Sequence, residues 1–568
     1  MGGHGRTLRT CALCIAAAWL GGYAGAPSAW SQLRVVTYNT GTGQADNPAT
    51  GQTARAGIGT ILQAIGAEAY GPAGSAFAKP IDVLLLQEQH TLAISTQSFV
   101  NVLNGIYGAG VYARGIVQGA TSDPNAEAGR PGVVYNTQTV QLLEEVAFGA
   151  VGTADGTGPT PAQQPRSTLR YKFKPVGYDD SAIFYAYNSH YKSDTGTGNN
   201  NRRLAEAQSI RANADALGEG VHAIYAGDFN IQTSSGTAYQ HLLSAGNGQA
   251  FDPVNRPGSW HDNATFADLF TQAPATASQY AGQTVGGMDD RFDFQLITAE
   301  LQDNAGMSYL PGTYHALANN GSVPCCNSPI TAGTGQTPAV RTALMQASDH
   351  LPVIADYMLP AKLGVQVTAV PQFIELGASV AIDVMVSNVA PAVHVAGVDQ
   401  LAYALGVTGS LAGGGMGLDA ALGGGNLHQV LLDSSTLGAK NGAITVTATS
   451  LQTASPLFSL PVSFQVISAF LAADFNRDGA VNETDLGQIT ANFGLMGAAK
   501  AQGDADADGD VDGNDFTTWQ RQLGQLPAGV SALAAVPEPA AAMLLAAAWC
   551  GLAATRRKRA GRRLRGRG

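Results

Sequence analysis

Six short segments in the first 360 residues place polar side chains directly after apolar runs. They are Thr37–Asn39, Leu86–Glu88, Tyr187–His190, Ala226–Asn230, Arg291–Asp293 and Ser348–Pro352. Strand ends are rigid and open to solvent, so a layered sheet can bring such side chains to one place. Carboxylates, amides and imidazoles together could hydrolyse a phosphoester, which needs a cation, a base for water and donors for the developing charge.

Each chemical role has a candidate residue in this set. Glu88 is the expected hard anionic ligand of the cation, with Asn39 as a neutral oxygen ligand beside it. So sparse an oxygen site suits Mg²⁺ or Mn²⁺, which keep most of their waters. His350 is the expected base. Asp228 and Asp349 could orient or supplement that base, or could bind metal themselves.

The remaining polar residues are expected to contact the phosphate. Asn230 and His190 could donate hydrogen bonds to it, and Asp293 is the expected carboxylate partner of His190. A carboxylate beside an imidazole keeps the ring protonated near neutral pH. Each residue alone also has a structural explanation, such as a strand-end cap for Asn39 or a surface carboxylate for Glu88. The order and spacing of the whole set is the stronger signal.

The sequence around these segments alternates between strand and helix patterns. Strands are predicted at Leu33–Asn39, Ile81–Gln87, Val133–Asn136, Ala182–His190, Ala223–Gly227 and Phe292–Thr298, and helices at Thr53–Ile65 and Arg202–Leu217. Such alternation predicts a layered α/β domain over residues 33–360, with sheets buried between helices. The hydrophobic fraction of 45% excludes wholesale disorder.

The order of the motifs resembles that of the endonuclease/exonuclease/phosphatase family, whose fold is the deoxyribonuclease-I-like four-layer α/β sandwich. The resemblance covers about Leu33 to Pro360 and implies that Asn39 and Glu88 bind metal, one ion or two. Arg166, before a strand, falls where members often place a phosphate-contacting arginine. The family's other catalytic motifs fall on His190, Asp228, Asn230, Asp293, Asp349 and His350.

Charge and motif details bear on the substrate. Residues 33–360 carry 16 basic and 26 acidic side chains, which argues against strong non-specific affinity for nucleic acid. Ile231 stands where inositol phosphatases tend to have arginine, and Asp289–Asp293 lacks their Cys-Asp-Arg pattern. The expected activity is hydrolysis of phosphodiester bonds, with a nuclease favoured. The alternatives are a phosphomonoesterase or a sphingomyelinase-like phospholipid diesterase of the same family, a non-catalytic cell-surface scaffold or adhesion protein, or a dockerin-borne component of an extracellular complex.

The residue pattern of the sequence changes after the first domain. Residues 362–468 contain β-branched segments separated by glycine and proline, without a helix pattern. These segments are Val365–Val370, Val380–Ser387, Ala443–Thr449 and Val462–Val466. They predict a small all-β sandwich that acts as a spacer or adhesion domain.

A twelve-residue motif then occurs twice, thirty residues apart, within residues 472–526. Calcium loops of this length supply oxygen ligands from positions 1, 3, 5, 7, 9 and 12, with glycine at position 6. The first loop offers Asp474, Asn476, Asp478, the Ala480 carbonyl, Asn482 and Asp485; the second offers Asp504, Asp506, Asp508, the Asp510 carbonyl, Asp512 and Asp515. The repeat resembles a type I dockerin, a small α-helical module with paired EF-hand-like Ca²⁺ loops, which implies a cohesin-like partner. Positions 10 and 11 depart from the Ser/Thr pair of many dockerins.

Both chain ends have the composition of targeting segments. Arg6 and Arg9 precede an apolar run and then small residues to Ala29, the layout of a secretory signal in residues 1–29. Residues 536–568 contain Pro-Glu-Pro, an uncharged apolar run and a basic cluster. This order resembles a PEP-CTERM sorting signal, which implies processing by an exosortase-type enzyme and a weak or transient membrane association. We expect an exported protein located outside the cell or at its surface.

Cysteine usage agrees with export. Between the two terminal segments the sequence has only Cys325 and Cys326, which are adjacent and could form a vicinal disulfide or remain free. They lie in a stretch between Ser308 and Gln346 that we interpret as an insertion near the site.

Overall fold

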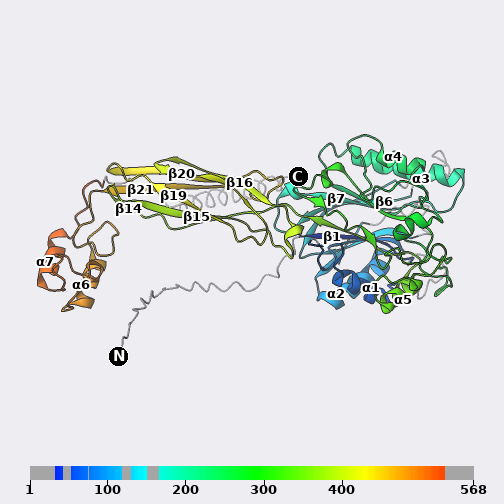
Figure 1. Ribbon diagram of the computed structural model, residues 1–568, viewed down its shortest axis with the longest axis horizontal. Helices are drawn as coiled ribbons and strands as arrows, with labels where there is room; N and C mark the ends of the chain where they lie inside the picture. Colours follow the sequence, from blue (N-terminus) through cyan, green and yellow to red (C-terminus); the bar gives the residue numbers. More distant parts are fainter. Residues whose placement is uncertain (1–31, 42–52, 75, 118–128, 150–165, 531–568) are drawn as a thin grey trace, which may run out of the picture.

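The computed structural model describes residues 32–41, 53–74, 76–117, 129–149 and 166–530. Figure 1 shows an α/β part, a part made of strands and a small part with two helices, which follow one another along the long axis. The expected targeting segments, 1–29 and 536–568, lie outside the described residues. Within the described ranges, every helix is too short or too polar to cross a membrane.

The α/β part contains two β-sheets. The first has seven strands in the order β10-β12-β1-β2-β4-β3, with β11 also paired to β12. Its strands are β1 (Leu33–Asn39), β2 (Val83–Gln89), β3 (Tyr112–Arg114), β4 (Arg130–Asn136), β10 (Ser308–Tyr309), β11 (His315–Ala316) and β12 (Val353–Met358). The second has five strands in the order β5-β6-β7-β8-β9. These are β5 (Val140–Phe148), β6 (Thr168–Pro175), β7 (Phe184–His190), β8 (Ala223–Asp228) and β9 (Asp293–Ile297).

Helices cover the outer face of each sheet (Figure 1). Beside the first sheet lie α1 (Ile58–Ala67), α2 (Gln97–Tyr107) and α5 (Pro338–Ala347), and beside the second lie α3 (Thr197–Asp215) and α4 (Thr237–Leu243). Shorter turns complete this part: η1 (Leu92–Thr96), η2 (Asp180–Ala182), η3 (Ala264–Leu269), η4 (Ala299–Leu301) and η5 (Ile330–Ala332).

Alternating side chains of β1 show how the four layers hold together. Leu33 and Val35 face the second sheet and join the apolar core between the sheets. Val36 and Tyr38 point the other way, into the core that contains Ile61 of α1. A strand buried on both faces is mostly apolar, and Arg34, the one charged residue of β1, is paired with Asp356 at 2.8 Å. The layers are therefore helix, sheet, sheet, helix, as the sequence predicts for residues 33–360.

The second part is built from two facing sheets. One has the order β13-β15-β19-β17 and the other β14-β21-β20-β16-β18. The strands are β13 (Leu363–Val367), β14 (Phe373–Glu375), β15 (Val380–Asn388), β16 (Leu401–Gly409), β17 (Leu411–Ala412), β18 (Gly415–Asp419), β19 (Asn426–Leu432), β20 (Gly438–Ala448) and β21 (Leu457–Ile467), with the turn η6 (Val395–Gly397). Val384 of one sheet and Val446 of the other share one buried core.

The third part contains α6 (Glu483–Asn492), η7 (Lys500–Gln502) and α7 (Gly513–Gln522). The two repeats exchange equivalent backbone hydrogen bonds: Gly494 N donates to Val511 O at 2.8 Å, and Gly524 N donates to Val481 O at 3.1 Å. Val481 and Val511 lie in the same small core, together with Ile489 and Trp519. The thirty-residue repeat of the sequence is thus a two-fold repeat in space.

Candidate active site

Neighbouring strand ends place the polar motifs side by side. His190 is the last residue of β7 and pairs in parallel register with Asp228, the last residue of β8. Asp228 also pairs with Asp293, the first residue of the antiparallel strand β9. In the other sheet, Asn39 at the end of β1 pairs with Gln87, next to Glu88. Both sheets therefore deliver their motifs to the same edge of the sandwich.

The Asn39 side chain joins the two sheets. Its Nδ2 donates to Glu88 Oε1 and to Asp228 Oδ2, both at 3.0 Å. His190 Nε2 lies 3.9 Å from Glu88 Oε1 and 3.5 Å from Asp228 Oδ2. His350 Nε2 lies 3.6 Å from Asp228 Oδ2. Residues separated by up to 311 positions in the sequence thus form one continuous buried cluster.

Unusual backbone conformations aim two of these side chains. Glu88 has φ 55° and lies where the β2–β4 register shifts between Leu86 and Gln89, a β-bulge. Gly129 packs against this bulge, and a Cβ there would lie 2.5 Å from Glu88 Cα. In the Gly-Asp-x-Asn motif, Gly227 has φ 140°, and a side chain there would overlap the carbonyl oxygen of Ser189. The motif's glycine is therefore required by the close approach of β7 and β8.

The structure corrects the expected partner of Asp293. Its Oδ2 lies 2.7 Å from His350 Nδ1, so it pairs with His350 and not with His190. The strand order explains this, because β8 separates β7 from β9 and puts Asp293 two strands away from His190. His190 Nδ1 is buried and has no hydrogen-bond partner within the described ranges. The oriented imidazole of the site is that of His350.

The buried charges shift the pKa values of the cluster. Burial, with the nearby Asp349 carboxylate, raises the pKa of Glu88 to about 7. Burial and Asp293 raise the pKa of Asp228 to about 7, against the opposing effect of His350. Both carboxylates are thus held without enough positive charge to balance them. A bound cation would supply that charge.

The two imidazoles respond in opposite directions. Burial opposes a charge on His350, but Asp293 and Asp228 outweigh it and raise its pKa well above the usual value. Burial, followed by the Arg166 and His350 charges, lowers the pKa of His190 well below its usual value. The site therefore holds one imidazole that favours its protonated form and one that favours its neutral form.

The donor set fits a hard divalent cation. Glu88 and Asp228 offer carboxylate oxygens within one buried group, the donors that Mg²⁺ and Mn²⁺ prefer. The Asn39 amide turns its Nδ2 toward both carboxylates while its Oδ1 accepts from Gly41 N at 3.2 Å, so Asn39 would bind the cation through Oδ1 after its amide rotates. Asp349 Oδ2 accepts from Thr284 N at 3.1 Å, whereas its buried Oδ1 has no hydrogen-bond partner among the residues that the structure describes. Because Asp349 also raises the pKa of Glu88, its carboxylate is a further candidate ligand.

Asn230 and Arg166, which were predicted to contact the phosphate, bind backbone groups near the cluster. Asn230 N donates to Asp228 Oδ1 at 3.0 Å, and its partly exposed side chain donates to Tyr191 O at 3.1 Å. Arg166 is buried, and its Nη1 donates to Tyr191 O at 2.8 Å and to His190 O at 3.5 Å. Arg166 Nη1 thus supports the strand end behind His190, and the phosphate contact of Arg166 stays a prediction.

Several supporting residues carry no motif in the sequence. Gln272 Nε2 lies 2.8 Å from His350 Nε2, from an irregular segment that gives no sequence signal. Ser348 Oγ donates to Asn39 O at 2.7 Å and accepts from His350 N at 3.0 Å, which ties β1 to the Ser-Asp-His motif. Gln87 Nε2 donates to Asn188 Oδ1 at 2.7 Å across the two sheets. For Gln87 and Asn188 the sequence does carry a signal, because each is an amide residue within an otherwise apolar strand.

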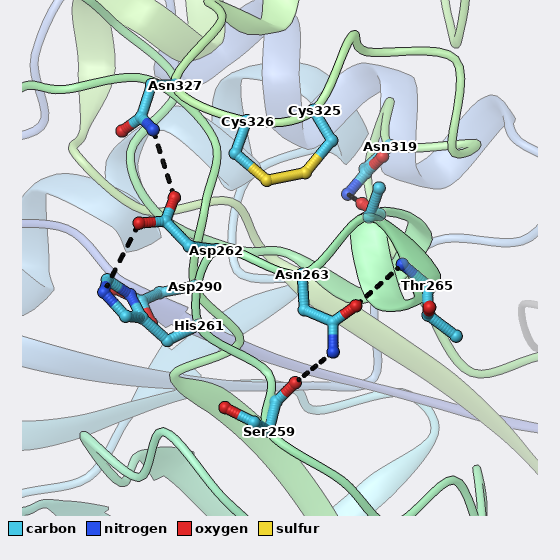
Figure 2. Close-up of a disulfide and its surroundings, with 11 residues drawn as sticks. Ser259, His261, Asp262, Asn263, Thr265, Asp290, Asn319, Cys325, Cys326 and Asn327 are labelled. Carbon is cyan, nitrogen blue, oxygen red and sulfur yellow. Dashed lines mark hydrogen bonds and ion pairs between the residues drawn. A yellow bond between two sulfur atoms is a disulfide. The ribbon is translucent and has the colours of Figure 1, made fainter.

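A second imidazole–carboxylate pair lies outside this cluster. His261 Nδ1 is 3.0 Å from Asp290 Oδ1, and Asp262 accepts from Asn327 Nδ2 at 3.1 Å (Figure 2). Next to Asn327, Cys325 and Cys326 are joined by a disulfide, the first of the two states open from the sequence.

Comparisons with known proteins complete the description. No family model matches the sequence, and no curated protein matches it. Among solved structures, an endonuclease/exonuclease/phosphatase from Bacteroides vulgatus is 19% identical, covers 58% of this chain and 99% of its own, and has a TM-score of 0.35. The human Nocturnin catalytic domain with bound sulfate is 15% identical, covers 58% of this chain and 96% of its own, and has a TM-score of 0.35.

A mannosyl-6-phosphatase from Bacteroides thetaiotaomicron is 17% identical, with 58% of this chain and 100% of its own covered and a TM-score of 0.34. TM-scores of 0.34 to 0.35 are too low for this likeness to indicate a function.

Proposed function

We propose that the α/β part is a divalent-metal-dependent phosphoesterase that hydrolyses phosphodiester bonds. The observation that carries the proposal is the Asn39 amide between Glu88 and Asp228, with both imidazoles within 4 Å of this carboxylate pair. A bound cation would stabilise the ionised form of these buried acids, and two histidines beside a cation site can serve phosphoryl transfer. The proposed family is that of the endonuclease/exonuclease/phosphatase enzymes.

The side chains divide the reaction between them. Glu88 and Asn39 would hold Mg²⁺ or Mn²⁺, with Asp228 or Asp349 as further ligands; the ion would polarise a phosphoryl oxygen. Asp293 fixes the His350 ring through Nδ1, so that Nε2 is the atom that holds or moves a proton. His190 Nε2, 3.5 Å from Asp228 Oδ2, would contact the phosphate.

The substrate is tested by a panel. Nucleic acid is the substrate favoured by the sequence, and phosphomonoesters and phospholipid head groups are the same-family alternatives. The full chain would be assayed with plasmid DNA, RNA, bis-p-nitrophenyl phosphate, p-nitrophenyl phosphate and sphingomyelin vesicles in Mg²⁺, with and without EDTA. We expect hydrolysis of at least one phosphoester, lost in EDTA.

Matched variants show whether the cluster is responsible. Glu88→Gln and His350→Ala should abolish the hydrolysis, whereas Glu219→Gln, an exposed acid outside the cluster, should retain it. Hydrolysis that His350→Ala leaves intact would remove this mechanism. A wild-type protein that cleaves none of the panel would favour the non-catalytic scaffold.

We also propose that the third part binds two Ca²⁺ ions. In the second loop, ligand atoms of Asp504, Asp506 and Asp515 lie within 4.8 Å of one another. Gly479 and Gly509 take positive φ angles of 84° and 92° at the sharp turns, as such loops require. Export, retention at the cell surface after exosortase-type processing, and docking to a cohesin-like partner belong to the same proposal.

A further inference from the structure

A cleft of about 760 Å³ opens beside the cluster of Glu88, Asp228 and His350. One wall is the loop after β7 with the start of α3, and the other is the segment between β8 and α4. Asn230 and Gln272 line the cleft and also contact Asp228 and His350. A group attached to a phosphate at the cluster can therefore extend into this space.

Uncharged hydrogen-bonding groups dominate the cleft wall. The hydroxyls of Ser193, Thr195 and Thr237 and the amides of Asn201, Gln232 and Gln272 face it. Hydroxyl and amide groups can both donate and accept, which matches the alternating donor and acceptor character of a polyol. Partly exposed Phe292 adds the one aromatic surface among the lining residues.

The two charged residues of the wall are already engaged. Asp194 pairs with Lys192 Nζ at 3.0 Å. The Arg203 guanidinium donates to the carbonyl oxygens of Lys192 and Asp194, and Arg203 is only 7% exposed. Grooves for nucleic acid strands combine free lysines and arginines with several stacking aromatics. Neither feature lines this cleft, in agreement with the acid excess of residues 33–360.

We propose that the cleft binds the uncharged, polyhydroxylated part of the substrate, so that the enzyme acts on phosphate esters of sugars. This rests on the metal-dependent phosphoesterase function proposed above, and within it favours the phosphomonoester alternative over phosphodiester bonds. The volume lies in the range of small-molecule sites, about 300–1,000 Å³. In the reaction, water oxygen bonds to phosphorus, the bond from phosphorus to the sugar oxygen breaks, and that oxygen takes up a proton.

A kinetic comparison on the full chain tests the substrate class. The probes are glucose 6-phosphate and maltotriose phosphorylated at a 6-hydroxyl, against p-nitrophenyl phosphate and a single-stranded oligonucleotide. We expect kcat/KM for the better sugar ester to exceed that for p-nitrophenyl phosphate at least tenfold. The two sugar probes distinguish a free sugar phosphate from a phosphate carried on a glycan.

A double variant locates the recognition in the cleft. Asn201→Ala with Thr237→Val removes two hydrogen-bonding groups at about 1 kcal/mol each, so KM for the sugar ester should rise about tenfold or more with kcat nearly unchanged. The control pair, Gln141→Ala with Thr447→Val, is exposed and lies outside the cleft. A selectivity that persists in the cleft variant would overturn the proposal.

The failures are distinguishable. If the aryl ester or the oligonucleotide is cleaved at least as efficiently as both sugar esters, the sugar proposal is wrong and the phosphoesterase function stands. If no phosphoester is cleaved, the proposed function itself fails, and the sugar proposal with it.

Discussion

Replacing Asp293 by asparagine isolates the carboxylate that orients the proposed catalytic imidazole. Asp293 Oδ2 lies 2.7 Å from His350 Nδ1, and both residues are buried. The asparagine side chain would keep the size and an acceptor oxygen but lose the charge that raises the pKa of His350. Positioned acid–base groups contribute about 10²–10⁴-fold to rate. We therefore expect Asp293→Asn to lower kcat by about 10²-fold or more, with KM for bis-p-nitrophenyl phosphate within about threefold.

The control variant makes the same Asp→Asn change in a histidine–aspartate pair outside the cluster. Asp290→Asn removes the charge from the His261–Asp290 pair, three residues earlier in the sequence. We expect near wild-type turnover from this variant and similar thermal unfolding of both. Turnover by Asp293→Asn above a third of the wild-type value, or an equal loss in Asp290→Asn, would refute the assigned role of the His350–Asp293 pair.

Three further changes test the scaffold. In Gly129→Ala the new Cβ would clash with the backbone of Glu88 and displace its carboxylate, so kcat should fall about 10²-fold. The control Gly105→Ala, with nothing within 4 Å of its new Cβ, should keep the wild-type kcat, and equal kcat values for the two variants would contradict the bulge argument. Gly227→Ala should lower the free energy of unfolding by about 1–3 kcal/mol through its clash with strand β7, measured by urea unfolding; an unchanged midpoint would contradict it. Removing Ca²⁺ with EGTA should accelerate hydrogen exchange over residues 474–522 but not in β1 or β8; identical exchange would refute the calcium loops.

The polar residues that meet at this edge of the sheets could be predicted from the sequence, because each follows directly on the apolar run of a strand. The apolar run of β1 ends at Asn39 and that of β8 ends with Gly-Asp, as predicted within a residue. The pairing of Asp293 does not follow, because it depends on the order β7-β8-β9, which only the folded sheet defines. Gln272 could not be identified either, since an irregular segment brings it to His350.

Strands β5 and β6 were not among the predicted strands, because one face of each is partly exposed and carries polar residues. In β6, Tyr171 and Phe173 are buried between the sheets, while Arg170, Lys172 and Lys174 alternate with them on the more exposed face. The charges interrupt the continuous apolar run by which the buried strands are recognised. Strand β5, which pairs with β6 along the sheet edge, lacks such a run for the same reason.

The central claim is that Glu88 and Asn39 hold a divalent cation beside His350. Crystals of the full chain grown with MnCl₂, measured at the manganese absorption edge, test this directly. We predict an anomalous peak in contact with the Glu88 carboxylate and its loss in Glu88→Gln crystals. Turnover that survives EDTA, together with no peak at Glu88, would contradict the account.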